Sequence, residues 1–416
     1  MLVVLLGVFA GLNAQEGIAF SHGSWEEIKA EAKKSKKNIF IDCYTVWCGP
    51  CKALSRDIFP QKAVGDFFNS NFVNFKVDME KGEGIELKEQ FRVSAFPTLL
   101  WIDSDGELLH KVVGSMSADK LISEAEKAPE MAKQTDRIIR KYKRHRKSEE
   151  HVKAYLDYLI AGYDPLVSDV AVEYLQLIPE NRYFDEDIFP IIAQQLKDPH
   201  GPTLSYLYDN QALLVEKFGK DFPSSFFYGK YIGWAMGLSY EIKAGKDFNN
   251  EAFQKLIDLM TEKSFEHTTH IVDQTQLKNL ELLADWDAYM DKIASLIGEP
   301  DSVDYFNSVG IYLRPILNSS CTDAEKFKDC LSYVEQSFKN NTELDLMQYN
   351  IMWGDKVKIY EKLGDPEALL EVKTEKAFLQ TLIQKEMSIA QKKGTGIKAM
   401  GMMGSSARPK KAAKLK

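Results

Sequence analysis

The chain has 416 residues, of which 44% are apolar and 27% charged, so it can bury substantial cores in about two or three domains. Its formal net charge of −8 argues against a nucleic-acid-binding surface over most of the chain, and no nucleic-acid partner is expected. No long apolar run follows the N-terminus, which argues against membrane-spanning segments in the body of the chain.

Residues 1–14 have the pattern of a secretory signal peptide. An apolar stretch runs through Leu12 and ends in small and polar residues, so cleavage is expected after Ala14. Two features oppose this interpretation, because no Lys or Arg precedes the stretch and Leu12 occupies a position where a small residue is preferred. The alternative is a short buried segment, since the run falls short of the ~20 helical residues that span a bilayer. Export predicts a periplasmic or other extracytoplasmic location.

Two cysteines lie three positions apart at a predicted strand-to-helix junction. The run 37–44 is apolar with β-branched and aromatic residues, and helical spacing begins after the CGPC sequence of Cys48–Cys51. At a helix start, unpaired N–H groups and the positive end of the helix dipole stabilise a thiolate, so Cys48 is the expected nucleophile. Cys51 lies about 4.5 Å further along the helix, within bridging reach and less exposed, and is expected to be the resolving thiol.

The other three cysteines leave two questions open. Half of a structural zinc site is the alternative to a redox pair, but Cys43, Cys321 and Cys330 supply no second CxxC and no His lies at finger spacing, so no metal is expected. Cys321 and Cys330 could pair in an oxidising compartment. A helix beginning at residues 322–323 would hold their Cα atoms ~13 Å apart, so pairing requires a later helix start.

The sequence FIDCYTVWCGPCK at residues 40–52 resembles the central strand and active-site turn of the thioredoxin superfamily. Residues 94–100 are similar to that family's cis-proline loop and next strand, and residues 101–114 form a predicted hairpin turning at Ser104-Asp105-Gly106. The resemblance implies an α/β thioredoxin-like fold, a mixed sheet flanked by helices, for residues 18–128. The long charged loop 78–84 is more similar to periplasmic thiol-disulfide interchange domains, although a solvated loop is the simpler interpretation.

The resemblance also implies roles for several side chains. Asp42 would be the buried acid that accepts or relays the proton of Cys51, the alternative being a strand residue that faces solvent. The lysine that commonly pairs with this acid falls on Asn74, with Lys76 two residues further along the same face. Cys43 would point to the opposite face as a buried apolar residue.

Substrate binding is expected around the cysteines and at a cis peptide opposite them. The backbone beside Pro97 would pair with an extended substrate strand, whereas without the resemblance this residue would be read as a strand-entry proline. The substrate-binding residues implied are Trp47, Gly49, Pro50, Phe96 and Pro97.

Helical spacing dominates from about Pro129 to residue 390. Candidate helices cover residues 131–147, 149–162, 166–177, 185–196, 204–219, 224–244, 250–263, 275–297, 301–317, 322–339 and 343–363. Short connections predict successive antiparallel hairpins, as an α-solenoid or irregular superhelix, although only residues 355–370 resemble a tetratricopeptide turn. Such a region either binds a protein or packs on the redox domain as a structural appendage. Residues 391–416 are basic and predicted to be disordered.

The sequence therefore predicts an exported thiol-disulfide oxidoreductase that reduces the disulfides of client proteins, with the Cys48/Cys51 dithiol as the only cofactor. The Gly-Pro pair between the cysteines resembles the reducing members of the family. A reductase in an oxidising compartment needs an electron donor, expected to be a membrane or periplasmic thiol reductant. The alternative is a helical scaffold or client-binding protein with an accessory redox-sensing domain.

Overall fold

The computed structural model describes residues 16–298, 305–340 and 346–392. The expected signal peptide and residues 393–416 of the predicted disordered tail lie outside the described residues, as do the predicted helix starts at Asp301 and Glu343. Residues 391 and 392, which were predicted to belong to that tail, are helical instead. The chain separates into two compact units, divided between Phe226 and Phe227.

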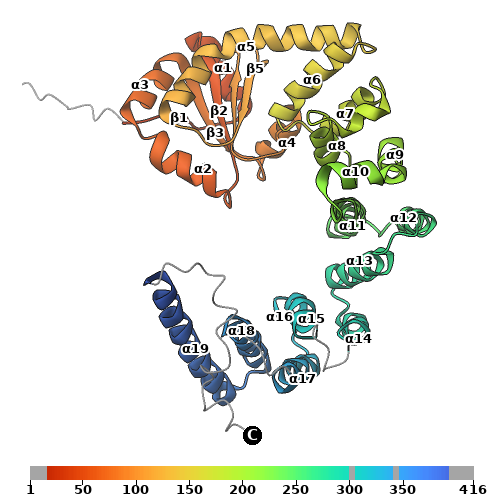
Figure 1. Ribbon diagram of the computed structural model, residues 1–416. Coiled ribbons are helices and arrows are strands. Elements are labelled where there is room, and N and C mark those ends of the chain that lie inside the picture. The colour runs from red at the N-terminus through yellow and green to blue at the C-terminus, as the bar shows by residue number, and fades with distance from the viewer. Residues whose placement is uncertain (1–15, 299–304, 341–345, 393–416) are drawn as a thin grey trace, which may run out of the picture. The chain divides into compact units, whose positions relative to one another are not determined.

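A five-stranded sheet with the order β1-β3-β2-β4-β5 forms the centre of the N-terminal unit (Figure 1). The strands are β1 (Phe20–Ser21), β2 (Asn38–Tyr44), β3 (Phe72–Asp78), β4 (Thr98–Ile102) and β5 (Leu108–Val113). The first three are parallel, and β4 and β5 are antiparallel to their neighbours. In the turn between β4 and β5, Asp103 accepts hydrogen bonds from two backbone N–H groups and Gly106 has a φ of +95°, as the predicted hairpin requires.

Helices cover both faces of this sheet. On one face lie α1 (Trp25–Ser35) and α4 (Glu83–Gln90), and on the other α3 (Lys62–Asn71) and α5 (Ala118–Arg144). Alternate residues of β2 enter the two cores, because successive side chains of a strand point to opposite faces. Ile39, Ile41 and Cys43 pack with α1, whereas Phe40 packs with α3 and α5. Cys43 is therefore the buried apolar residue that was expected.

Helix α5 runs without interruption past Pro129, so the expected domain boundary at residues 128 and 129 falls inside a helix. The predicted helix 131–147 is only its C-terminal half. Ser117 caps the start, and Leu121, Ala125 and Ala128 bury one face against the sheet. Packing against the sheet thus maintains the helix across a proline that normally interrupts one.

The rest of the N-terminal unit is helical. It contains α6 (Glu149–Ala161), α7 (Val167–Leu175), a 3₁₀ turn (Glu180–Phe184), α8 (Phe189–Gln195), α9 (Pro202–Asp209), α10 (Gln211–Phe218) and the start of α11 (Phe222–Lys243). The single helix predicted at 204–219 is wrong, because the chain leaves helical geometry at Asn210, between α9 and α10.

The second unit is entirely helical over the residues described. After α11 it contains α12 (Asn250–Glu262), α13 (Thr268–Leu283), α14 (Trp286–Leu296), α15 (Tyr305–Tyr312), α16 (Arg314–Leu317), α17 (Ala324–Asn340), α18 (Leu346–Leu363) and α19 (Pro366–Lys392). The prediction of one helix over 275–297 is wrong, because Ala284 is left-handed and separates α13 from α14. The helix predicted at 301–317 is likewise two helices over its described part, and α19 was not predicted.

This unit has its own apolar core, formed mainly by α13–α18 around residues such as Ile293, Val309 and Phe327. Cys330 lies in that core and Cys321 precedes α17 half-buried, and both are free thiols. None of the helices described is long and apolar enough to cross a membrane.

Candidate active site

The active-site turn lies where β2 ends and α2 (Gly49–Ala53) begins. Cys48 is the N-cap residue of α2, and its sulfur accepts a hydrogen bond of 3.1 Å from the backbone N–H of Cys51. Pro50 occupies the first turn of the helix, where a backbone N–H has no acceptor within the helix, so the absence of this group costs no hydrogen bond. The two sulfurs form a disulfide, so the pair is in its oxidised state.

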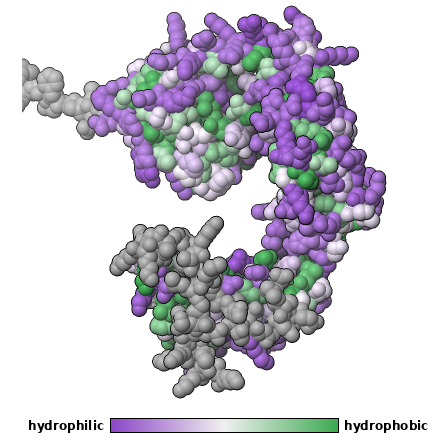
Figure 2. Space-filling model, viewed as in Figure 1, coloured by the Kyte–Doolittle hydropathy of each residue, from purple (hydrophilic) through white to green (hydrophobic). Residues whose placement is uncertain are grey.

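Both cysteines are buried in this state, whereas the residues around them are exposed. Cys48 is 3% and Cys51 2% exposed, so the expected difference in exposure between the two thiols is not visible in the disulfide. Trp47 is 63% exposed, and Gly49 and Pro50 are exposed beside it. In Figure 2, pale and green atoms interrupt the hydrophilic surface of the redox domain near this turn. A partner can therefore contact the rim of the disulfide without any rearrangement of the core.

Helix α2 continues into a π-helical turn, Leu54–Ile58, in which the N–H of Phe59 bonds to the carbonyl of Leu54. Such turns are rare and often accompany functional sites. This one carries Ser55, whose hydroxyl is hydrogen bonded to the ammonium of Lys76. Sequence reasoning missed Ser55, because regular helical spacing gives no signal for a π turn.

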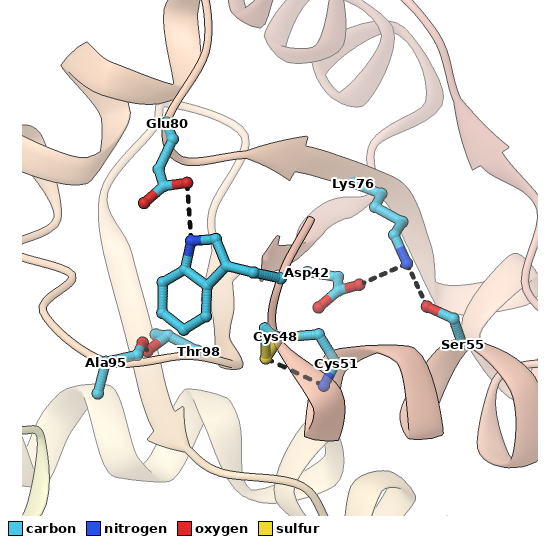
Figure 3. The surroundings of a disulfide bond; sticks show 9 residues. Asp42, Cys48, Cys51, Ser55, Lys76, Glu80, Ala95 and Thr98 are labelled. Carbon is cyan, nitrogen blue, oxygen red and sulfur yellow. Dashed lines mark hydrogen bonds and ion pairs between the residues drawn. A yellow bond between two sulfur atoms is a disulfide. The ribbon is translucent and has the colours of Figure 1, made fainter. Parts of the chain in front are cut away.

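Asp42 is completely buried beneath the active-site turn, so the alternative of a solvent-facing strand residue is wrong. Its carboxylate lies 3.0 Å from the ammonium of Lys76 (Figure 3). Burial raises the pKa of Asp42, and the charge and hydrogen bond of Lys76 offset part of that rise. In Figure 3 the carboxyl group lies between Lys76 and the two cysteines. A carboxyl group with a raised pKa at this position can take up a proton at a pH where a surface aspartate cannot.

Lys76 is the basic partner of Asp42. The sequence alone did not decide whether position 74 or position 76 faces this acid. It is paired directly with Asp42 across the parallel strands β2 and β3. Its ammonium also lies 4.8 Å from the ring centroid of Tyr44 and 5.6 Å from that of Phe59, within the range of cation–π attraction. Asn74, two residues before Lys76, instead donates hydrogen bonds to Asn69 and to the carbonyl of Ala19.

The loop opposite the disulfide contains the expected cis peptide between Phe96 and Pro97. The carbonyl of Pro97 accepts a hydrogen bond from Gly114, and the hydroxyl of Thr98 donates to the carbonyl of Ala95 at 2.7 Å (Figure 3). These bonds fix the loop on both sides of the proline. Thr98 was not predicted, although its position directly after the proline is a local signal.

Two aromatic rings connect this loop with the active-site turn. Trp47 meets Phe96 edge to face, with ring centroids 6.1 Å apart. The indole N–H of Trp47 donates a 2.9 Å hydrogen bond to Glu80, in the loop that was interpreted as merely solvated (Figure 3). The expected substrate-binding residues therefore lie on two adjoining loops, and Glu80 orients one of them.

An exposed rim around a helix-capping disulfide, with a buried titratable carboxyl beneath it, can exchange that disulfide with a pair of thiols on another molecule. This is the chemistry of a thiol-disulfide oxidoreductase. No group of three or more His, Cys, Asp or Glu side chains that could hold a metal ion occurs in the part of the chain that the structure describes.

Comparison with known proteins identifies the family. Residues 25–129 match the family model of the thioredoxin-like domain. Thioredoxin H-type of Oryza sativa subsp. indica is 34% identical over 111 residues, which cover 26% of this chain and 85% of that protein. The chain accordingly belongs to the thioredoxin-like family of thiol-disulfide oxidoreductases.

Two further likenesses are confined to the same part of the chain. The thiol:disulfide interchange protein DsbD of Pseudoalteromonas atlantica is 30% identical over 105 residues, 24% of this chain and 18% of that protein. A solution structure from Bacteroides thetaiotaomicron, described as a candidate disulphide-isomerase, is 46% identical. The latter match covers 27% of this chain and 93% of that one, with a TM-score of 0.26.

Proposed function

We propose that this protein is an exported reductase of protein disulfides. In the reduced enzyme, the thiolate of Cys48 attacks one sulfur of a client disulfide, forms a mixed disulfide and releases the other client sulfur as a thiol. Cys51 then attacks the sulfur of Cys48, which releases the second client thiol and leaves Cys48 and Cys51 joined. Two electrons and two protons pass to the client in each turnover, and the dithiol is the only cofactor that the reaction uses.

The observation that carries this proposal is the buried Asp42 beneath the cysteine pair. The second step requires Cys51 to lose its proton, because the thiolate and not the thiol is the nucleophile. A carboxylate whose pKa is raised by burial is a stronger base than a surface aspartate, so Asp42 suits this proton transfer near neutral pH. Lys76 keeps that carboxylate ionised until the proton arrives.

The exposed rim supports a role in client binding. We assign Trp47, Gly49 and Pro50 on one side, and Phe96 and Pro97 on the other, to contact with the client. An extended client segment would pair with the loop backbone beside Pro97 and lie against the edge-to-face pair of Trp47 and Phe96.

The direction of exchange and the location are further parts of the proposal. The Gly-Pro dipeptide between the cysteines favours a reducing couple, as in thioredoxin at about −270 mV rather than a strong periplasmic oxidant at about −120 mV. The apolar N-terminal sequence supports export to the periplasm. Because each turnover leaves an oxidised pair, the enzyme there needs a membrane or periplasmic thiol reductant as its electron donor.

Trapping of mixed disulfides tests this function. Cys51→Ser should accumulate client proteins linked to Cys48, visible as adducts that disappear on reduction, while wild type reduces insulin. The matched control is Cys321→Ser, which removes a thiol outside the active site and should trap nothing. The absence of adducts, together with the absence of insulin reduction by wild type, would rule the enzyme function out. Titration against glutathione tests direction, and a potential well above about −180 mV would favour an oxidase or isomerase.

A second candidate function is a scaffold in which the helical region binds clients and the redox domain senses oxidation. The observation in its favour is that the second compact unit has an apolar core of its own, formed by residues between Leu277 and Leu363. A scaffold that acts by binding alone should keep its cellular function when Cys48→Ser removes the nucleophile. Loss of that function with unchanged client binding would exclude a role in binding alone.

A further inference from the structure

The turn between α6 and α7 contacts the segment that leads into the cis-proline loop. Asp164 lies in the turn between α6 and α7, and its carboxylate is 3.1 Å from the guanidinium of Arg92, in the segment that leads from α4 to Pro97. The side chain of Asp164 is only 3% exposed. A buried carboxylate is retained when its charge is compensated, so this contact defines the position of the turn on the redox domain.

A second cation lies near the carboxylate of Asp164. We call the contacts of Asp164 and Tyr163 with Arg92, Ser94 and Lys111 the joint. The ammonium of Lys111, on β5, lies 4.0 Å from the carboxylate of Asp164 and is itself 6% exposed. It also donates hydrogen bonds to the carbonyls of Phe91 and Arg92, at 3.4 and 3.2 Å. Lys111 therefore connects β5, the start of the segment 91–97 and the α6–α7 turn.

The joint extends toward the active site through Ser94. Its hydroxyl donates a hydrogen bond to the backbone carbonyl of Tyr163, which precedes Asp164. Both Tyr163 and Arg92 have a φ of 48°, a left-handed conformation that non-glycine residues adopt only where the surroundings enforce it. The contact between the α6–α7 turn and the segment 91–97 thus has one strained residue on each side, Tyr163 in the turn and Arg92 in the segment.

This arrangement leaves an aromatic ring exposed near the expected client path. Ser94 is two residues before Phe96, so the turn that contacts it adjoins the loop on which an extended client would lie. Tyr163 is 60% exposed, and Trp47, whose ring meets Phe96 of that loop, is 63% exposed. Exposed aromatic side chains on rigid backbone are the commonest anchors in protein interfaces.

We propose that the α6–α7 turn is part of the client-binding site, with Tyr163 as a specificity-determining residue and Asp164 as a positioning residue. This inference rests on the proposed reductase function. The occupant is an extended polypeptide segment that carries an apolar or aromatic side chain near its disulfide. Such a side chain packs on the ring of Tyr163 while the backbone pairs beside Pro97. A small disulfide such as oxidised glutathione has no segment of this kind, and its reduction does not depend on the turn.

Two variants separate the effect of the Tyr163 ring from that of the hydrogen bond between Ser94 and the Tyr163 carbonyl. Tyr163→Ala removes the ring and keeps the backbone carbonyl that Ser94 binds, whereas Ser94→Ala removes that hydrogen bond and keeps the ring. Tyr163→Ala should raise KM for insulin about three- to ten-fold and leave kcat and glutathione reduction unchanged. The matched control is Val172→Ala, an exposed apolar residue of α7 outside the joint, which should match wild type.

Asp164→Asn tests positioning. Loss of the charge pair should raise KM for insulin with little change in the potential of the Cys48/Cys51 couple, and Asp164→Glu should restore part of the affinity. Near-UV circular dichroism checks the fold of each variant. If Asp164→Asn does not fold, Ser94→Ala gives the same test, because it also loosens the loop and should raise KM for insulin.

Wild-type KM for insulin in both Tyr163→Ala and Ser94→Ala would overturn this inference and leave the reductase function intact. An equal loss toward insulin and glutathione in Tyr163→Ala would also overturn it, since that outcome indicates damage to the dithiol site. Failure of wild type to reduce any disulfide would overturn the reductase function and this inference together.

Discussion

Asp42 and Lys76 are direct cross-strand partners, with the carboxylate of one 3.0 Å from the ammonium of the other. The carboxylate is fully buried, while the lysine side chain is 25% exposed. Burial therefore acts mainly on the acid, and its pKa lies above the usual value in spite of the neighbouring positive charge. The lysine limits the rise in the pKa of Asp42 that burial causes.

Substitution of Lys76 by Met should shift the pH dependence of the reaction. Without the ammonium, the pKa of Asp42 rises further, so the carboxylate form needed for the second step is reached at higher pH. We expect the rising limb of the single-turnover rate of insulin reduction to move to higher pH, and the rate at about pH 7 to fall about ten-fold. Lys76→Arg should retain most of the wild-type profile, and Lys62→Met, at an exposed ion pair with Asp66, should not alter it. An unshifted profile in Lys76→Met would contradict the proposed role of the pair.

Asp42→Asn should stabilise the oxidised protein, and the gain should depend on pH. A carboxyl group whose pKa is higher in the folded state binds protons more tightly when folded, so wild-type stability falls as pH rises from about 3.8 through the raised pKa. The neutral amide avoids that loss. Urea unfolding at about pH 8 should show a gain of about 1–3 kcal/mol, and at about pH 4 a smaller one. A gain that is equal at both pH values would mean that the carboxyl group does not titrate as inferred.

Alkylation should distinguish the reactive cysteines of the chain from those buried in its cores. Burial and the charge of Asp42 raise the pKa of Cys43, and burial raises that of Cys330 to about 12, so neither forms a reactive thiolate. After reduction of the folded protein, iodoacetamide should label Cys48 and the half-buried Cys321 but spare Cys43 and Cys330. Peptide mass spectrometry gives the answer, with the unfolded protein as the control in which all five react. Rapid labelling of Cys43 in the folded protein would contradict its place in the core.

Pro129→Ala should stabilise the N-terminal unit. The proline lies inside α5 with its ring exposed, where it removes one backbone hydrogen bond and crowds the preceding turn. Alanine restores the bond and has a higher helix propensity, so urea unfolding should show a gain of about 1–3 kcal/mol. Glu130→Ala, at the next exposed position, controls for propensity alone. A loss of stability in Pro129→Ala would show that the packing of α5 requires the local bend.

The parts of the site that were predictable are those encoded locally. The strand, the CGPC turn and the Phe96–Pro97 peptide each depend on a few adjacent residues, and the structure has them as the sequence indicated. The partner of Asp42 depends on the register between two strands, and a shift of two residues along β3 would place Asn74 instead of Lys76 opposite Asp42 on the same face. The sequence therefore could not decide whether Asn74 or Lys76 lies opposite Asp42.

Helix boundaries were less predictable, because packing and unusual backbone angles overrode local propensity. Ala284 ends α13 in a left-handed conformation that alanine disfavours, and α5 continues through Pro129 against the usual effect of proline. The contacts between Ser94 and Tyr163 and between Arg92 and Asp164 join residues about 70 positions apart. No spacing pattern in one sequence reveals such pairs.

The continuity of α5 has a kinetic consequence. A flexible linker would let a client held on α6 or α7 sample many orientations, and its disulfide would meet Cys48 at a local concentration set by linker length. Here a helix of 27 residues and the ion pair of the buried Asp164 with Arg92 replace that freedom. For a client bound at the α6–α7 turn, encounter with the dithiol is then determined by the distance along the client chain between its anchoring side chain and its disulfide.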